Sequence, residues 1–245
     1  MPVTTIPVLE ASGIGHRFGA LVVLDGVDFH LQGAEAVGVV GPNGAGKTTL
    51  LNILAGSLHP TTGSVRFRGT VVTRLAPDQR CRLGIARAHQ VPRPFGGMTV
   101  FENVLVGAGV GAGRRGAAAH EQALRSLELC GLVDVANRRA ESLGLLHRKR
   151  LELARALATD PQALLLDEIG GGLTDAEADE LLDTVRAIRQ GGVAVVWIEH
   201  IVHVLVQAID RLVCFDAGRV IADGPPAAVV EDAAVIDAYL GAARA

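Results

Sequence analysis

The chain has 245 residues, a formal net charge of −3 and 49% hydrophobic residues. This length suits one large domain, or one domain with an inserted subdomain, around a sizeable buried core. A charge near neutral gives no basic field, so we expect no nucleic-acid partner. No apolar run approaches the ~20 residues needed to span a bilayer, and no signal-peptide pattern opens the chain, so we expect a cytoplasmic protein.

The three cysteines stand far apart in the sequence, at Cys81, Cys130 and Cys214. An odd number with wide spacing fits neither a disulfide framework nor a pair of Cys-x-x-Cys metal ligands. We therefore expect reduced thiols, most of them buried.

The first ninety residues have the pattern of short strands followed by a glycine-rich turn and a helix. We expect strands at residues 9–19, 27–31 and 34–41, the last a continuous apolar run typical of a strand covered on both faces. The turn and helix follow at 41–56, and a further strand lies between glycines at 63–69.

Between residues 92 and 160 the pattern becomes helical. Short helices are expected at 98–107 and 120–132, joined by a flexible Gly/Ala linker at 107–119. The apolar face of the second helix would carry Leu124, Leu127 and Leu132. We interpret this stretch as a helical subdomain inserted into an α/β body.

The α/β pattern resumes after residue 160. It predicts a strand at 163–167, a helix at 175–192, a strand at 193–200, a hairpin at 211–224, and a short helix with a tail at 233–245.

The strongest motif is GPNGAGKT, in which Gly41, Gly46, Lys47 and Thr48 satisfy G-x-x-x-x-G-K-[ST] between a strand and a helix. Glycines let backbone N–H groups approach phosphates, lysine neutralises the β/γ charge, and the threonine hydroxyl can bind Mg²⁺. The alternative is an ordinary glycine-rich turn. The motif predicts a phosphate-binding P-loop for a nucleotide such as ATP.

An acidic pair follows the apolar strand ALLL. Asp167 would lie at the carboxyl end of that strand, where open α/β sheets bind ligands. We expect Asp167 to hold Mg²⁺ through water and Glu168 to act as the general base toward the attacking water. The alternative is a pair that only caps the strand end.

The order of these motifs, with ELARALATDP, GLTDAE and WIEH, resembles the nucleotide-binding subunit of ATP-binding cassette (ABC) transporters over nearly the whole chain. The resemblance implies an α/β fold: a P-loop NTPase (RecA-like) core with an antiparallel β subdomain and an inserted α-helical subdomain. The core would comprise about 1–91 and 161–245, and the helical subdomain about 92–160. It also implies an ATPase that works as a head-to-tail dimer with two ATP molecules at its interface.

Four further residues take roles from the resemblance. Gln90 matches the glutamine that senses the γ-phosphate and Mg²⁺, and His200 matches the switch histidine, whereas neighbouring His203 is left as structural. Asp175 matches the aspartate that reaches across the dimer, although it would otherwise serve as a helix N-cap. Phe18 matches the aromatic that stacks on adenine, although a core position is the alternative. The implied nucleotide contacts in the P-loop are Gly41, Pro42, Asn43, Gly44, Ala45, Gly46, Lys47, Thr48 and Thr49, and the implied metal contacts are Thr48, Gln90 and Asp167.

The family's signature motif, Leu-Ser-Gly-Gly-Gln at the start of a helix, is degenerate here in SLGLLHRKRLELARAL. An ungapped alignment places Leu143-Gly144-Leu145-Leu146 over Leu-Ser-Gly-Gly, whereas a two-residue shift aligns Ser142 and Gly144 with Ser-x-Gly. The sequence leaves both alignments open, and Ser142 and Gly144 are the candidate contacts to the partner's nucleotide. The helix itself is expected to set Leu151, Ala154, Leu157 and Ala158 opposite Arg148, Lys149, Glu152 and Arg155. A second departure is Ile169, where the family usually has proline.

Within the family, the chain is most similar to the ATP subunits of branched-chain and related amino-acid importers, through GPNGAGKTTLLNILAG, MTVFENVLVG and VIDAYLG. The resemblance implies membrane-spanning permease subunits, a second ATP-binding subunit and, indirectly, a periplasmic substrate-binding protein as partners. It places the chain at the cytoplasmic face of the cell (inner) membrane. The alternatives are the ATPase of a lipid or polysaccharide exporter and a regulatory ATP-binding subunit that hydrolyses slowly.

Overall fold

The computed structural model describes residues 6–200 and 202–242. The chain divides into two compact units, Met1–Pro77 with Ala194–Ala245, and Asp78–Val193. Among the described residues, no helix is both long and apolar enough to cross a membrane.

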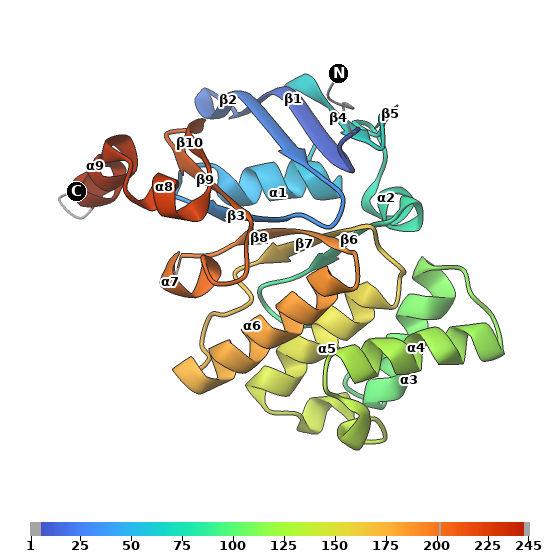
Figure 1. The fold of residues 1–245 in the computed structure, drawn as a ribbon. Coiled ribbons are helices and arrows are strands. Elements are labelled where there is room, and N and C mark those ends of the chain that lie inside the picture. The colour runs from blue at the N-terminus through green and yellow to red at the C-terminus, as the bar shows by residue number, and fades with distance from the viewer. Residues whose placement is uncertain (1–5, 201, 243–245) are drawn as a thin grey trace, which may run out of the picture. The chain divides into compact units, whose positions relative to one another are not determined.

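The first unit contains an antiparallel sheet of four strands (Figure 1). Its order is β2 (Leu21–Leu31), β1 (Leu9–Phe18), β4 (Thr62–Phe67) and β5 (Thr70–Val71). Alternate residues of β1 are buried, so one face of this sheet contributes to the core. The strand expected at 27–31 is β2, which is longer than predicted and begins at residue 21.

The same unit contains the strands that flank the P-loop. β3 (Ala36–Val40) pairs in parallel with β8 (Ala194–Ile198) and β9 (Arg211–Asp216), and β9 pairs antiparallel with β10 (Arg219–Gly224). All residues of β3 and β8 are buried, as their continuous apolar runs predict. Helix α1 (Lys47–Ala55) lies between β3 and the four-stranded sheet (Figure 1). The described part of this unit also contains the helices α7 (Val202–Leu205), α8 (Pro226–Val230) and α9 (Ala233–Ala242).

An ion-pair network joins β9 to its neighbours. The Arg211 guanidinium contacts the Glu35 carboxylate at 2.7 Å and the Asp223 carboxylate at 2.8 Å. Burial alone would raise the pKa of Glu35, but hydrogen bonds from Arg211 and from the Gln32 N–H outweigh it and lower that pKa. This network holds the open end of the β9–β10 hairpin, opposite its turn.

The second unit also has strands. β6 (Ile85–Ala88) pairs in parallel with β7 (Ala163–Asp167), and helix α6 (Asp175–Gln190) follows β7. Strand β6 and the preceding helix α2 (Pro77–Leu83) were not predicted, because IARA and PDQRCRL are too short to show a period.

A bundle of helices makes up most of the second unit (Figure 1). It contains α3 (Val100–Val106), α4 (Ala117–Leu129) and α5 (Leu145–Leu157), which pack against one another. Short 3-10 helices lie at Val133–Val135 and Ala140–Ser142.

The structure corrects the flexible linker predicted at 107–119. Residues Gly107–Gly111 form a π-helix that continues α3. A Cβ atom at Gly107 would lie 2.5 Å from the carbonyl oxygen of Arg155, so the glycine allows helices to approach closely. The small residues here serve packing, and the same composition is typical of flexible linkers, which explains the error.

The predicted helix faces also need correction. Leu124 is 44% exposed, whereas Leu127 and Leu132 are fully buried, although Leu132 lies beyond the end of α4. On α5, the side chains of Lys149 and Glu152 are buried although both were placed on the polar face. Glu152 accepts hydrogen bonds from the Arg93 N–H at 2.7 Å and from Arg155 at 2.8 Å, which compensates its burial.

Candidate nucleotide site

The P-loop of the first unit has the backbone that its glycines predict. Gly41 has φ 142°, and a Cβ atom there would overlap the carbonyl oxygen of Phe215. Gly46 has φ 101°, and its Cβ would lie 2.7 Å from the Leu24 side chain and 2.8 Å from the Val23 carbonyl oxygen. Both positions therefore exclude any side chain.

Charge is concentrated where this loop enters α1. Lys47 is buried, and its ammonium group donates to the carbonyl oxygens of Gly41 at 2.7 Å and Pro42 at 2.9 Å. Thr48 and Asn43 are exposed, and the first turn of α1 contains no acidic residue. The helix N-terminus and Lys47 together therefore favour an anion.

Two other predicted residues belong to this unit. Phe18, at the end of β1, is 53% exposed and stacks edge-on against the His16 ring with 4.6 Å between ring centroids. An exposed ring held by a neighbour suits stacking on a base, and the core alternative is wrong for this side chain. His200 follows β8 with its side chain 56% exposed, 3.8 Å from the Glu199 carboxylate.

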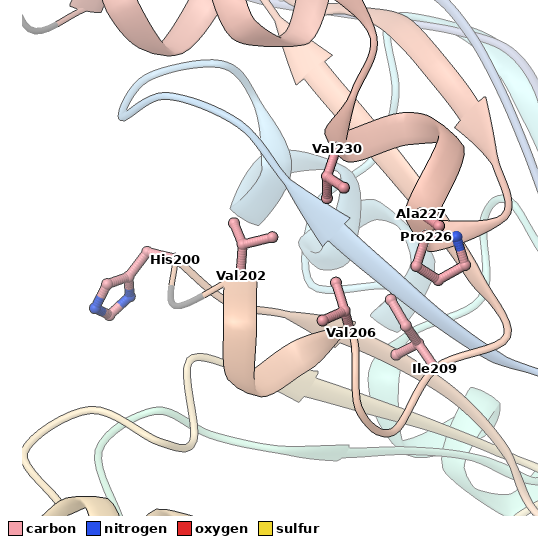
Figure 2. A pocket seen from close by; sticks show the side chains of 7 residues that line it. All are labelled: His200, Val202, Val206, Ile209, Pro226, Ala227 and Val230. Carbon is pink, nitrogen blue, oxygen red and sulfur yellow. The ribbon is translucent and has the colours of Figure 1, made fainter.

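His200 also borders an apolar cavity of about 1020 Å³. Figure 2 shows its ring at the edge of the cavity, pointing away from the aliphatic side chains that line it. Apart from His200, the described residues that line this cavity are apolar, and they offer little to hold a triphosphate. His203 lies in α7, but its side chain is outside the described residues.

In the second unit, Asp167 is the last residue of β7 and is buried. Arg87, on the adjacent strand β6, contacts its carboxylate at 2.6 Å. Arg87 was not predicted as a site residue. The sequence indicated it only by its position three residues before Gln90.

Glu168 and Gln90 are brought together in this unit. The Gln90 amide donates to the Glu168 carboxylate at 2.8 Å. Glu168 has φ 45°, a left-handed conformation that is uncommon outside glycine, and the following Ile169 is buried. Strain of this kind concentrates at functional sites.

The degenerate signature lies directly before α5. Gly144 is the N-cap residue, with φ −69°, and among the described residues no side chain caps this helix. Ser142 lies two residues earlier and is exposed, and its hydroxyl donates to the Arg139 carbonyl oxygen at 2.8 Å. The helix start therefore presents backbone N–H groups, while the nearest hydroxyl is engaged in its own turn.

Asp175 is the first residue of α6 and is exposed. The alternative that it caps this helix is wrong, because the N-cap is Thr174, whose hydroxyl accepts the Glu177 N–H. The Asp175 carboxylate is thus not required for capping.

Comparisons with known proteins agree with these features. A family model for ABC transporters matches residues 24–170, and a model described as branched-chain amino acid ATP-binding cassette transporter matches residues 219–245. The chain is 37% identical to the high-affinity branched-chain amino acid transport ATP-binding protein BraF of Pseudomonas aeruginosa, over 97% of this chain and 99% of that protein. It is 35% identical to the ATP-binding protein LivG of Escherichia coli K12, over 97% and 99% of the two chains.

Among solved structures, a cassette of an ABC transporter in its ADP conformation superimposes with a TM-score of 0.87, at 30% identity over 97% of this chain and 100% of that one. A nucleotide-free cassette gives a TM-score of 0.86 at 29% identity, over 95% and 98%. The predicted fold class is confirmed. The P-loop geometry, the acidic pair after β7 and these similarities over nearly the full length show that the chain belongs to the ABC transporter family, as one of its ATP-binding, ATP-hydrolysing subunits.

Proposed function

We propose that this chain powers an importer for branched-chain or related hydrophobic amino acids, through ATP-driven head-to-tail dimerisation. The observation that carries the proposal is the similarity to BraF and LivG from end to end, including the separate match at residues 219–245. Substrate recognition would lie in the permease subunits and in a periplasmic binding protein. The chain would act at the cytoplasmic face of the cell membrane with a second ATP-binding subunit.

ATP would be held by the P-loop, residues 41–49, with adenine stacked on the exposed ring of Phe18. Lys47 would leave the carbonyl oxygens of its own loop for the β- and γ-phosphates, because ionic partners outweigh neutral ones. Asp175 would reach the partner subunit, for which its exposed carboxylate is suitable.

The three predicted metal ligands have the chemistry that Mg²⁺ prefers. The Thr48 hydroxyl, the Gln90 amide oxygen and the Asp167 carboxylate are the oxygen donors that Mg²⁺ prefers. Phosphate oxygens and water would complete the coordination, as they usually do for Mg²⁺ bound with a nucleotide. Bound Mg²⁺ would neutralise charge on the phosphates.

Hydrolysis would depend on Glu168 as the general base, with Gln90 and His200 near the γ-phosphate. The Gln90 amide bonds the Glu168 carboxylate, so movement of Gln90 toward the γ-phosphate would free this base. This hydrogen bond would link nucleotide sensing to activation of water.

The test replaces Glu168 with Gln in the transporter reconstituted with its permease subunits. We expect hydrolysis to fall about a hundred- to ten-thousandfold, because a general base is lost, while ATP binding is retained. Unchanged turnover would show that another group activates the water. Import of radiolabelled leucine into proteoliposomes tests the substrate class, and hydrolysis without leucine uptake would contradict it.

A second candidate function is that of a regulatory subunit in an asymmetric dimer, where the nucleotide site on the partner subunit hydrolyses ATP slowly. The uncapped start of α5 favours it. In a head-to-tail dimer this helix would complete the partner's site, and the P-loop of this chain would serve a site completed by the partner. Single-turnover hydrolysis measured separately at the two sites of a heterodimer decides between them, because equal rates exclude the asymmetric form.

A further inference from the structure

The only tyrosine of the chain bonds the P-loop backbone from the C-terminal helix. Tyr239 lies in α9, and its hydroxyl oxygen accepts the Gly41 N–H at 2.9 Å, across 198 positions of sequence. It belongs to VIDAYLG, one of the stretches that make the sequence similar to the ATP subunits of branched-chain amino-acid importers. Nothing in the proposed roles above uses this contact.

Gly41 is held from two directions. Its N–H is bound by Tyr239, and its α-carbon packs so closely on the Phe215 carbonyl that no Cβ fits. Because Gly41 begins the P-loop, these contacts set where the loop leaves β3. A shift of Gly41 would carry with it the carbonyl oxygen that Lys47 contacts.

The Tyr239 hydroxyl remains neutral. Burial raises the pKa of Tyr239, and the nearby Cys214 adds to this, against the lowering effect of the Gly41 N–H. A neutral phenol accepts one hydrogen bond without placing negative charge beside the phosphates.

The packing of α9 leaves open space beside Tyr239. A cavity of about 270 Å³ borders α9. Its lining includes Val40, Val202, Val235, Ile236 and Tyr239. The described side chains that line the cavity have no van der Waals partners on that side. Val202 and Val230 line both this cavity and the larger one of Figure 2. Among the described residues, the hydrogen bond from the Gly41 N–H to the Tyr239 hydroxyl gives a specific polar link between α9 and the loop.

We propose that Tyr239 is a positioning residue for the P-loop, through which the C-terminal helix sets the affinity of this chain for MgATP. This inference rests on the proposed binding of ATP at residues 41–49. It gives the C-terminal segment a role within the nucleotide site.

The test compares Tyr239→Phe with Ile236→Ala in the full chain. Phenylalanine removes only the hydroxyl, whereas Ile236→Ala removes packing from the same helix and cavity without touching Gly41. Calorimetric titration with MgATP should show about three- to tenfold weaker binding for Tyr239→Phe, the usual effect of one hydrogen bond, and less than about twofold for Ile236→Ala. Amide hydrogen exchange of Gly41, followed by NMR, should accelerate in Tyr239→Phe and not in Ile236→Ala.

Equal MgATP affinity of wild type and Tyr239→Phe would overturn the inference, as would equal losses in both variants. A measurement on the wild type needs no variant: tyrosine labelled only at the ε positions of the ring gives one NMR signal from this chain, and MgATP should shift it. An unmoved signal would count against the coupling. If the wild-type chain failed to bind MgATP at all, the proposed function itself would fail, which separates the two conclusions.

Discussion

Helices α1 and α5 each begin one residue after a glycine, yet the two glycines have opposite surroundings. Gly46 has φ 101° and contacts Leu24 and Val23 so closely that a side chain is excluded. Gly144 has an ordinary φ of −69°, and a Cβ built on it would meet no atom of the described residues within 4 Å. The first glycine is required by the fold, whereas the second is not.

The difference shows how a helix start becomes a phosphate site. Both helices have free N–H groups and a dipole. At α1, the buried Lys47 ammonium group donates to carbonyl oxygens of the preceding loop, which folds back over the helix end. We infer that the P-loop can bind the nucleotide within this chain, whereas the start of α5 can only add to a site built by a partner.

The largest expected effect is that of Lys47→Ala. Removing the one ammonium group of the loop should lower ATP hydrolysis at least about a hundredfold, as loss of a key electrostatic contact does. The matched control is Lys149→Ala, since Lys149 is the only other lysine and lies near the start of α5. It should lower stability through lost burial but leave MgATP affinity within about twofold of wild type. Similar losses of MgATP binding in both variants would show that net charge, rather than the P-loop, holds the nucleotide.

A direct contrast is provided by Gly46→Ala and Gly144→Ala. The first should lower the free energy of unfolding by about 2 kcal/mol, because alanine is strained at φ 101° and clashes there. The second should cost at most about 1 kcal/mol, the difference between glycine and alanine as N-caps. Urea unfolding of both variants measures this, and equal destabilisation would remove the distinction between the two helix starts.

Much of the first unit could be predicted from the sequence because its elements carry strong local signals. Continuous apolar runs identified β3 and β8, and GPNGAGKT located the turn before α1. These signals lie within a few residues of each other. The hydrogen bond of Tyr239 to Gly41 could not be predicted, because it joins positions 198 residues apart.

The second unit was harder to predict because tertiary packing overrides its local patterns. Gly107 is typical of a linker but allows close packing against Arg155, and Glu152 has the pattern of a solvated residue but is buried and accepts two hydrogen bonds. The motif residues Asp167 and Glu168 were placed correctly at the end of a strand. Their partner Arg87 was not foreseen, because β6 is only four residues long.

A smaller effect is expected from Gly144→Ser, which would restore a hydroxyl at the uncapped start of α5. The new side chain should stabilise the helix by about 0.3 kcal/mol, because serine is a slightly better N-cap than glycine. In the assembled transporter it should raise hydrolysis at the partner's site by about fivefold, since a hydroxyl next to a phosphate makes a charge-assisted hydrogen bond. Single-turnover hydrolysis at that site measures the gain, and Gly144→Ala serves as the control that adds bulk without a hydroxyl. An equal response of both variants would mean that α5 does not face the nucleotide.

The smallest effect is expected from Ser142→Ala, and it distinguishes the two alignments of the signature. The Ser142 hydroxyl donates to the Arg139 carbonyl oxygen in an exposed hydrogen bond within one turn, so its removal should change the free energy of unfolding by less than about 0.5 kcal/mol. Hydrolysis in the assembled transporter should stay within about twofold of wild type, because that hydroxyl already has a partner. A tenfold loss would instead show that Ser142 turns toward the partner's phosphate, as the shifted alignment of Ser142 and Gly144 requires. The double variant Ser142→Ala/Gly144→Ser separates these cases, because a hydroxyl at position 144 would restore hydrolysis only if the two positions face the same phosphate.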